Sequence, residues 1–596
     1  MASERIDRKS LRRLRCIEKD NVSIVHAPSS VGPLSLTFGD AIRKQAKERP
    51  DALFIQSHHQ QKSLTYSQAN DRSDDLARGL AAQGVKKGDR VAIMAGNEIE
   101  YIEVFLACTK LGTPCALINY AYSEQELHSV LASINVSVLI MVPAFDRYDY
   151  RQWIPRFKER IRCLQHIVLL HGSRSDMDHG HAMDYEWLVS SGARHEMDYD
   201  LDLERVAQTL SDQEVINLQF TSGSTGLPKA SALTHRGLLH CAKNIGDTMY
   251  LTPSDRICLP VPLFHSFGIV IGVTTALVHG ASVVLCDNKF NVKATLESIG
   301  RYKCTGLYGV TTMFIAEMNY PDFAAYDLST LRFAILSGSA VPEALVRKVW
   351  ASIGITQTHT NWGMTEAGSI VTMTRDTDTL HQRMYTSGRL FPGFSAKIVD
   401  PATNLVVPRG ERGEIVLRGP GIQTNYFSNP SKTAEAHVKS PEDGLEWFHT
   451  GDQGIIDDQG FFTITGRIKD MIIRGGENIS PVEIEARLAA HPAVAQSSVV
   501  GVPDEKYGEQ ICAFLEPRAE SVLPSDDEVR AWVRQTLAHF KAPRYLVWLG
   551  THSKFRAWPK TGTGKLRKPD LRRIAQSILS EASALPDDRG TLSSRL

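Results

Sequence analysis

The sequence lacks an excess of charge of either sign. Its 67 Lys and Arg residues balance 67 Asp and Glu residues, so the formal net charge is zero. A balanced chain offers no general electrostatic attraction for nucleic acid or for an anionic membrane surface. We therefore expect no nucleic-acid partner, and any phosphate group must be held by a local site.

Closely spaced cysteine pairs are absent as well. The nine cysteines are scattered and none forms a CxxC pair, which favours reduced thiols over a disulfide framework or a cysteine metal site. The sequence Asp-His-Gly-His at residues 178–181 resembles a metal motif in isolation. Its polar, turn-rich surroundings favour a solvated loop.

No uninterrupted apolar run is long enough to cross a membrane. The most apolar long stretch, residues 267–285, contains three glycines, which favours a buried helix followed by a strand and predicts no transmembrane segment. The basic N-terminal segment 5–15 is accompanied by Glu4 and Asp7. Mitochondrial presequences are poor in acids, so a solvated leader is the favoured interpretation.

Helical and strand patterns alternate in the first part of the chain. Capping boxes are predicted at Thr65–Gln68 and Ser123–Glu126, each at the start of a helical pattern. Short apolar runs at residues 91–94 and 138–142 predict buried strands. This alternation predicts an α/β fold with parallel sheets covered by helices.

A second, smaller α/β unit is predicted from Arg467 onward. Residues 480–483 (Ser-Pro-Val-Glu) predict a helix start, with Ser480 as the cap, Pro481 in the first turn and Glu483 bonding back to the cap residue. Ser525 and Glu528 predict a second helix start. Strands are expected near residues 494–502, 510–515 and 545–549. The predicted organisation is a leader (1–35), a large domain (36–469), a small domain (470–573) and a flexible tail (574–596).

The segment Thr221–Lys229, TSGSTGLPK, is the most informative part of the sequence and follows a predicted strand at 215–218. Glycines let the backbone approach an anion, backbone N–H groups and hydroxyls can surround phosphate oxygens, and the lysine adds positive charge. A mobile surface loop would explain the small residues but not the closing Pro-Lys. The segment is not a Walker A loop, because Pro228 disfavours a helix there and Ala230 offers no hydroxyl to a metal. The candidate phosphate contacts are Thr221, Ser222, Gly223, Ser224, Thr225, Gly226 and Lys229.

Later motifs supply further nucleotide contacts. Trp362 can stack on a purine and Glu366 can ligate Mg²⁺, although a turn with a core tryptophan would look similar. Asp452 can accept hydrogen bonds from two hydroxyl groups. Taken alone, Asp452 and Arg467 would be interpreted as a surface ion pair.

TSGSTGLPK resembles the phosphate loop of the adenylate-forming, or AMP-binding, superfamily, which contains acyl-CoA synthetases, luciferases and peptide-synthetase adenylation domains. The motifs NWGMTE (361–366), HTGD (449–452), GRIKD (466–470) and PKTGTGK (559–565) follow in the family's order. The resemblance covers residues 36–573, far more than one short motif can support. It implies a large multi-sheet N-terminal domain with a small, mobile α/β C-terminal domain.

The resemblance also implies roles for individual residues. Thr365 would contact the AMP phosphate, the turn 338–340 would lie along adenine, and Asp452 with Arg467 would bind the ribose. The family usually has tyrosine at position 362, where this sequence has tryptophan. On this interpretation the remaining nucleotide contacts are Gly338, Ser339, Ala340, Asn361, Trp362, Gly363 and Met364.

Lys565 is the leading catalytic candidate. An exposed lysine in a basic tail is the simpler interpretation, but the motif match implies that Lys565 bridges the substrate carboxylate and the α-phosphate. Activation of a carboxylate by ATP needs positioning and charge stabilisation rather than a protein nucleophile, and no nucleophile elbow is evident. The catalytic candidates are Lys565, Thr365, Glu366 and Lys229, with ATP, Mg²⁺ on Glu366 and coenzyme A as cofactors and co-substrate.

Family members rotate the small domain between the two half-reactions. Asp470 resembles the hinge. Gly475 and Gly476 resemble the lining of the tunnel that admits coenzyme A.

His265 resembles the gate beside the acyl chain in family members, and Tyr308, Gly309 and Val310 resemble a wall of the acyl pocket. The region 306–341 most resembles medium-chain fatty acyl-CoA synthetases, although Thr311 stands where those enzymes commonly have proline. The predicted substrate is a medium-chain or branched aliphatic acid.

Several alternatives remain open at this point. An aryl-CoA ligase, a luciferase-like oxidase and a carrier-loading enzyme share the first half-reaction, and a non-catalytic nucleotide- or acyl-binding protein is a more distant possibility. The chain ends in Ser594-Arg595-Leu596, close to the Ser-Lys-Leu peroxisomal address. We therefore expect a peroxisomal import receptor as partner and the peroxisomal matrix as location, with the cytosol or the mitochondrion as alternatives.

Overall fold

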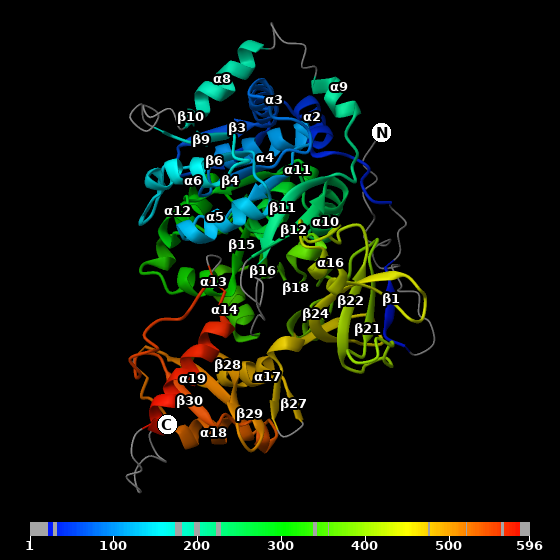
Figure 1. Ribbon diagram of the computed structural model, residues 1–596. Helices are drawn as coiled ribbons and strands as arrows, with labels where there is room; N and C mark the ends of the chain where they lie inside the picture. Colours follow the sequence, from blue (N-terminus) through cyan, green and yellow to red (C-terminus); the bar gives the residue numbers. More distant parts are fainter. Residues whose placement is uncertain are drawn as a thin grey trace.

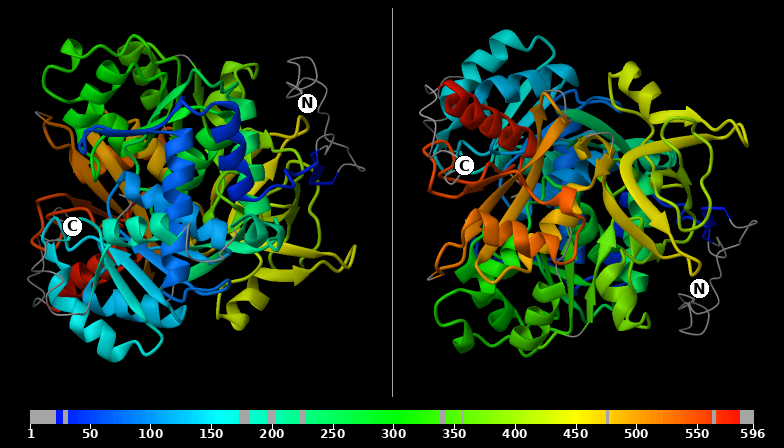
Figure 2. Two further views of the ribbon diagram at one scale, coloured as in Figure 1. Left: turned by 90° about the horizontal axis from the view of Figure 1, so that it is seen from above. Right: turned by 90° about the horizontal axis from the view of Figure 1, so that it is seen from below.

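The computed structural model describes residues 22–27, 32–172, 182–195, 203–221, 228–337, 343–355, 357–474, 477–519, 521–561 and 565–584. Figure 1 shows a larger part built from several sheets and, below it, a smaller part formed by the C-terminal segment. In the view from below in Figure 2, the smaller part lies across the underside of the larger part.

Two seven-stranded sheets form the centre of the larger part. The first has the strand order β10-β9-β6-β4-β5-β11-β12, and only β11 and β12 pair antiparallel. The second has the order β17-β16-β15-β13-β14-β2-β3, and only β2 and β3 pair antiparallel. The predicted parallel sheets are thus confirmed, with an antiparallel pair at one edge of each. Their strands are Leu53–Ser57 (β2), Lys62–Thr65 (β3), Val91–Met94 (β4), Cys115–Leu117 (β5), Val138–Met141 (β6), His166–Leu169 (β9), Met183–Asp184 (β10), Val215–Thr221 (β11), Lys229–Thr234 (β12), Arg256–Cys258 (β13), Ser282–Leu285 (β14), Gly306–Val310 (β15), Phe333–Ser337 (β16) and Gln357–His359 (β17).

A third, antiparallel sheet lies beside them, with the order β1-β21-β22-β24-β23 and β25 paired to β24. Its first strand lies within the predicted leader, so part of that segment belongs to the fold. The sequence did not predict this sheet. Its strands, together with two small antiparallel groups, are Ile24–His26 (β1), Ser395–Val399 (β21), Gly413–Arg418 (β22), His437–Lys439 (β23), Glu446–Ile456 (β24), Phe462–Arg467 (β25), Asn361–Trp362 (β18), Thr372–Met373 (β19), Arg389–Leu390 (β20), Ala144–Phe145 (β7) and Tyr148–Asp149 (β8).

Helices surround the two seven-stranded sheets of the larger part (Figure 1). The apolar stretch 267–285 forms a π-helix, a short α-helix and strand β14, which confirms the predicted buried helix and strand. The helices of this part are Phe38–Glu48 (α2), Tyr66–Ala82 (α3), Ile99–Leu111 (α4), Glu124–Ser133 (α5), Ile154–Arg160 (α6), Tyr185–His195 (α8), Leu203–Gln208 (α9), His235–Thr248 (α10), Phe267–Thr274 (η2), Thr275–His279 (α11), Val292–Tyr302 (α12), Thr311–Met318 (α13), Glu343–Ile353 (α14), Leu380–Tyr385 (α15) and Pro430–Ala436 (α16).

The predicted helix starts show how local sequence sets these boundaries. Thr65 and Ser123 each accept a bond from a backbone N–H three residues ahead, and the side chains of Gln68 and Glu126 return to the cap residue. Each box satisfies two backbone donors that have no partner inside the helix. The four residues of β4 and those of β6 are all buried, as a strand covered on both faces requires.

The smaller part has its own sheet and its own core. The strand order is β27-β26-β29-β28, with β30 parallel to β29. Two clusters of buried apolar side chains, one around Ile484 and one around Phe514, stabilise it. Its elements are Ile472–Arg474 (β26), Glu477–Ile479 (β27), Pro481–Ala489 (α17), Val494–Asp504 (β28), Gly508–Pro517 (β29), Asp526–Arg534 (α18), Tyr545–Trp548 (β30) and Lys568–Ala584 (α19).

Two local predictions in the smaller part need correction. Ser480 precedes α17 but does not cap it, because its hydroxyl donates to the carbonyl of Thr465 in β25. Glu483 pairs with Lys541 instead of returning to the helix start. Helix α19 also continues to Ala584, beyond the predicted boundary at residue 573.

Within the residues that the structure describes, no helix is long and apolar enough to cross a membrane. The cysteines in this part of the chain are free, and most are buried.

Candidate active site

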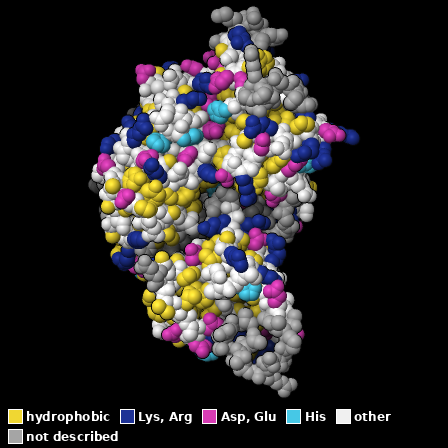
Figure 3. Space-filling model, turned by 90° about the vertical axis from the view of Figure 1, so that its left-hand side faces the viewer, with side chains coloured by type: hydrophobic (Ala, Val, Ile, Leu, Met, Phe, Trp, Pro, Cys, Tyr) yellow, Lys and Arg dark blue, Asp and Glu magenta, His cyan; other side chains and the backbone are white. Residues whose placement is uncertain are grey.

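The candidate site lies in a cleft between the larger and the smaller domain. Figure 3 shows the surface hollowed at their junction, with Lys and Arg side chains around the opening. The larger domain supplies the ends of β11 and β25, the middle of β24 and the segment 361–366, and the smaller domain supplies Lys565. Residues far apart in the sequence therefore meet in one place.

A buried carboxylate, Glu366, occupies the centre of the site. Thr221 Oγ1 and the Tyr426 hydroxyl both donate to Glu366 Oε1, at 3.2 and 3.0 Å. Burial and the negative charge of Glu366 raise the pKa of Tyr426, so this hydroxyl remains a donor. Among the described residues Oε2 has no hydrogen-bond partner, which leaves it available to a cation; carboxylate oxygens are ligands that Mg²⁺ prefers.

Lys229 lies beside this carboxylate, at the end of the predicted phosphate loop. Its Nζ is 5.0 Å from the centroid of the Tyr426 ring. It is paired with Thr221 across strands β11 and β12, so both side chains project from the same face. The two ends of the predicted phosphate loop are therefore adjacent, and the role of Lys229 as a phosphate contact stays a prediction.

The turn that carries Thr365 and Glu366 depends on a glycine. A Cβ atom at Gly363 would lie 1.9 Å from the carbonyl oxygen of Ser369. Any side chain at this position would push the turn open. Met364 directly precedes the 3₁₀ turn, which consists of Thr365–Ala367.

Asp452 lies on β24, directly opposite Arg467 on β25. Its Oδ2 accepts a 2.9 Å bond from Trp362 Nε1, and its Oδ1 lies 3.0 Å from Arg467 Nε in an ion pair. Oδ1 is buried but accepts no hydrogen bond from the described residues. Arg467 balances the charge at Oδ1, and the lone pairs of this carboxylate that remain free can accept from a hydroxyl group, such as those of a ribose.

Trp362 has a contact that its motif did not predict. Its ring is 7% exposed and lies nearly parallel to the Phe462 ring, 6.5 Å away, while its N–H holds Asp452. The Trp362 side chain thus orients the Asp452 carboxylate. The neighbouring Asn361 accepts a 2.8 Å bond from the hydroxyl of Ser337, at the end of β16.

Lys565 lies among these charged groups. Its loop is closed by two bonds with Thr561, one in each direction. The residue is exposed by its surface area, but the protein atoms that surround it between the two domains partly desolvate its ammonium group and lower the pKa to about 8. The positive charge of Arg467 acts in the same direction, whereas Asp452 and Glu366 oppose it.

His265 is also near Lys565. Burial lowers the pKa of His265 to about 3, and the charge of Lys565 contributes in the same direction, so the imidazole is neutral. Its Nδ1 accepts a 3.1 Å bond from the backbone N–H of Phe267. A neutral ring that accepts at Nδ1 carries its proton on Nε2, which can then donate to a carboxylate.

The remaining acyl-pocket candidates lie at the end of β15. Tyr308 is fully buried, with its hydroxyl 3.8 Å from the sulfur of Met249. A Cβ at Gly309 would lie 3.1 Å from the Phe314 ring, so only a glycine fits without displacement. Val310 is partly buried at the start of α13.

Asp470 ends a 3₁₀ turn, Ile468–Asp470 (η5), that connects the two domains. Arg572 on α19 lies 3.5 Å from its carboxylate and 3.4 Å from the Lys469 carbonyl. The predicted hinge is therefore contacted by a helix of the smaller domain. Ser222, Gly223, Ser224, Thr225, Gly226, Gly338, Ser339, Ala340, Gly475, Gly476 and the C-terminal tripeptide lie outside the described residues.

Comparison with known families decides the assignment. Residues 42–427 match the family described as AMP-binding enzyme, and residues 483–565 match the AMP-binding enzyme C-terminal domain. The chain belongs to the AMP-binding enzyme family. The two matched regions correspond to the larger and the smaller domain.

Individual relatives place the chain in the acyl-CoA ligase branch of this family. It is 40% identical over 573 residues to the acyl-CoA ligase sidI of Aspergillus fumigatus, covering 94% of this chain and 95% of the relative. It is 33% identical over 559 residues to the mitochondrial medium-chain acyl-CoA ligase ACSF2 of Bos taurus, covering 91% and 88%. The solved structure of the anthranilate CoA ligase AuaEII with anthranoyl-AMP has a TM-score of 0.76 and 25% identity, covering 93% and 99%. The protein is thus an AMP-forming acyl-CoA ligase.

Two contacts of this AMP-binding enzyme were not predicted from its sequence. Tyr426 is 60 residues from Glu366 and belongs to none of the recognised motifs. Gln219 lies only two residues before Thr221, but its partner is the carbonyl of Phe264. No spacing signal joins either pair, because each contact depends on how separate segments fold together.

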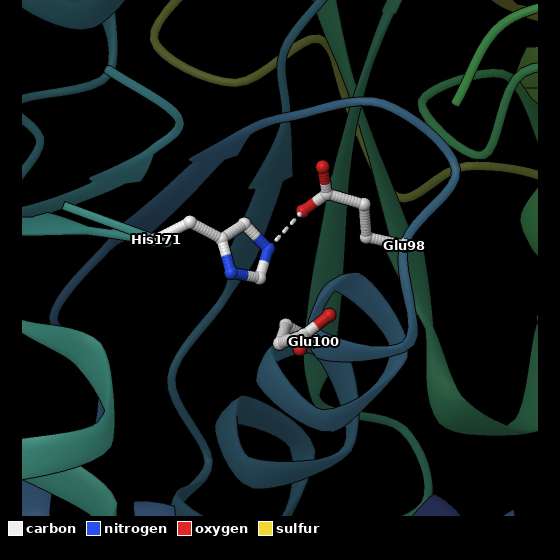
Figure 4. Close-up of side chains that lie close together, drawn as sticks. All are labelled: Glu98, Glu100 and His171. Carbon is white, nitrogen blue, oxygen red and sulfur yellow. Dashed lines mark hydrogen bonds and ion pairs between the residues drawn. The ribbon is translucent and has the colours of Figure 1, made fainter. Parts of the chain in front are cut away.

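A second cluster of ionisable groups lies where β4 and β9 end (Figure 4). His171 Nε2 is 3.1 Å from Glu98 Oε2, and these atoms with Glu100 lie within 4.8 Å of one another. Both oxygens of Glu100 are already bonded, to Gln60 at 2.6 Å and to Lys62 at 3.2 Å. We interpret the cluster as an ion-pair network that holds the start of α4.

Proposed function

We propose that this acyl-CoA ligase activates a medium-chain or branched aliphatic acid, with Mg²⁺ held by Glu366. The observation that carries the proposal is Lys565 of the smaller domain, whose charge interacts with those of Glu366 and Asp452 and lowers the pKa of His265. One cleft thereby contains groups for the nucleotide and for the acid.

In the first half-reaction a carboxylate oxygen of the acid attacks the α-phosphorus of ATP, and pyrophosphate leaves. Lys565 would stabilise the charge shared by the carboxylate and the α-phosphate, and Lys229 the charge on the departing phosphates. Asp452 would hold the ribose and fix the direction of attack. Mg²⁺ would neutralise phosphate charge when bound.

In the second half-reaction the sulfur of coenzyme A attacks the acyl carbon, the thiol proton is lost, and AMP leaves with the bridging oxygen. Rotation about Asp470 would withdraw Lys565 and bring the segment at Gly475–Gly476 to the cleft. Hinges are commonly a few residues at the ends of elements, as Asp470 is.

The proposed acid rests on the likeness of the region 306–341 to medium-chain synthetases and on a relative described as a medium-chain acyl-CoA ligase. An apolar pocket gains about 0.8 kcal/mol for each methylene that it buries. We therefore expect kcat/KM for CoA-dependent AMP release to rise over several carbons and then level off. A series of straight, branched and aromatic acids measures this. Maximal activity on acetate, or on an aromatic acid alone, would contradict the proposal.

The pKa of Lys565 predicts a pH dependence. Because its pKa is lowered to about 8, the free enzyme loses the ammonium charge as the pH rises through that value. We expect kcat/KM for acid-dependent pyrophosphate exchange to fall above about pH 8. Lys565→Arg keeps its charge and should lose activity without this alkaline fall. A flat parent profile to pH 10, or the same fall in the arginine variant, would contradict the assignment.

We also propose import into the peroxisomal matrix through Ser594-Arg595-Leu596 and an import receptor. A fluorescent protein fused to the N-terminus, which leaves the C-terminus free, should colocalise with a peroxisomal marker in a eukaryotic cell. Removal of the tripeptide should leave the fusion diffuse. A diffuse distribution with the C-terminus intact would rule out this location.

A further inference from the structure

One face of strand β11 carries three polar side chains in alternate positions. Asn217, Gln219 and Thr221 project to the same side, since neighbouring residues of a strand alternate. Asn217 and Gln219 are almost completely buried. Asn217 Nδ2 donates to Gln219 Oε1 at 3.3 Å, which orients the Gln219 amide. Polar groups buried this deeply are costly unless each has a defined partner.

The Gln219 amide connects this strand to the acyl gate. Its Nε2 donates to the backbone carbonyl of Phe264, which belongs to the peptide unit that joins Phe264 to His265. The N–H of the same peptide unit donates to the carbonyl of Pro262 at 3.2 Å. Both ends of the peptide unit are therefore fixed, and the Cα of His265 with them.

The ring of His265 is then fixed by the bond from Phe267 N–H to Nδ1. Because the His265 backbone and the ring atom Nδ1 are both held by hydrogen bonds, the ring has a fixed orientation. The N–H at Nε2 of the neutral imidazole therefore points in a fixed direction. A side chain that must donate to a reacting carboxylate depends on this kind of support, because small displacements in an active site cost large factors in rate.

We propose that Gln219 is a positioning residue of the adenylation step, which aims His265 at the carboxylate of the acid. Two residues further along the same strand face, Thr221 holds Glu366. One rigid strand thus sets the distance between the acyl gate and the metal-binding carboxylate. This inference rests on the proposed role of His265 in acid binding.

The test compares two variants of Gln219 with a matched control. Gln219→Met has a side chain of similar length but removes the bond to the Phe264 carbonyl and the bond from Asn217. Gln219→Glu keeps an oxygen that accepts from Asn217 but loses the N–H that donates to Phe264. Gln45 is the control, because it too is buried and donates from Nε2 to a backbone carbonyl, that of Leu277, at 3.0 Å. Gln45→Met therefore reports the general cost of losing such a bond.

We expect Gln219→Met to lower kcat/KM for the acid about tenfold or more in pyrophosphate exchange, the size expected when a buried partner is lost. The KM for ATP should change less than twofold, and Gln45→Met should leave both constants unchanged. Gln219→Glu should regain activity relative to the parent enzyme as the pH is lowered, because a protonated carboxyl can again donate to Phe264. The proposal would be overturned if Gln219→Met changed the constants for acid and ATP equally, or changed neither. It would also be overturned if the activity of Gln219→Glu relative to the parent enzyme did not depend on pH.

A readout without activity separates this inference from the proposed function. Nitrogen-15 NMR of the His265 ring, assigned with His265→Asn, should show a single Nε2–H tautomer in the parent protein and in Gln45→Met. In Gln219→Met the ring signals should move toward a mixture of tautomers. If the parent protein is inactive on every acid but Gln219→Met still shifts the ring signals, the proposed function is contradicted and the positioning role of Gln219 is not. Unchanged ring signals would overturn the positioning role.

Discussion

Lys565→Ala should abolish most of the first half-reaction and spare the second. Removal of one preorganised charge from a transition state costs about 10²–10³ in rate, and Lys565 of the smaller domain interacts electrostatically with Asp452 and Glu366 of the larger domain. Acid-dependent pyrophosphate exchange should therefore fall by at least this factor. The same variant, given pre-made acyl-adenylate and coenzyme A, should form thioester at close to the parent rate.

Two further variants complete this experiment. Lys560→Ala changes an exposed lysine of the same loop and should leave both half-reactions intact. Asp470→Pro fixes φ at the hinge and should damage thioester formation while adenylation continues. Equal damage to both half-reactions in the Lys565 and Asp470 variants would mean that the smaller domain does not alternate.

Asp452→Ala should have the second large effect, on ATP binding. Asp452 presents a buried carboxylate whose Oδ1 is paired with Arg467 and accepts no other bond from the described residues, and hydrogen bonds to a charged group contribute about 1.5–3 kcal/mol each. With two ribose hydroxyls to hold, kcat/KM for ATP should fall by about 10²–10⁴. Steady-state pyrophosphate exchange at varied ATP measures this.

Trp362→Phe tests how the carboxylate is held. This change keeps an aromatic ring but removes the N–H that donates to Asp452, so kcat/KM for ATP should fall by about tenfold. Asp458→Ala, in the exposed turn after β24, is the matched control and should behave as the parent. An Asp452→Ala enzyme with a KM for ATP within about twofold of the parent would exclude the ribose role.

Local signals in the sequence predicted the elements that they directly determine. Thr65 and Ser123 begin helices because cap and returning side chain are three residues apart, a distance fixed by the helix itself. The continuous apolar run of β4 requires burial on both faces, which parallel sheets provide. The chemical motifs likewise predicted that Glu366, Asp452 and the two ends of the phosphate loop lie in one site.

The remaining features depend on contacts between distant segments. Ser480 has the sequence of a helix cap, yet the carbonyl of Thr465 competes for its hydroxyl once the two domains meet. Stacking of Trp362 on a purine stays a prediction, but the motif gave no sign that its buried N–H donates to Asp452, 90 residues away. The bond from Gln219 to the Phe264 carbonyl, next to His265, likewise joins segments that are distant in the sequence. Such bonds follow from tertiary packing, which overrides local preference.

The path of the acid's own oxygen tests the central claim most directly. The acid, labelled with ¹⁸O in both carboxylate oxygens, is incubated with ATP, Mg²⁺ and coenzyme A, and the products are analysed by mass spectrometry. If acyl-AMP is the intermediate, one labelled oxygen leaves with AMP and the other remains in the thioester. Label in pyrophosphate or phosphate, or AMP without label, would contradict adenylation by this enzyme.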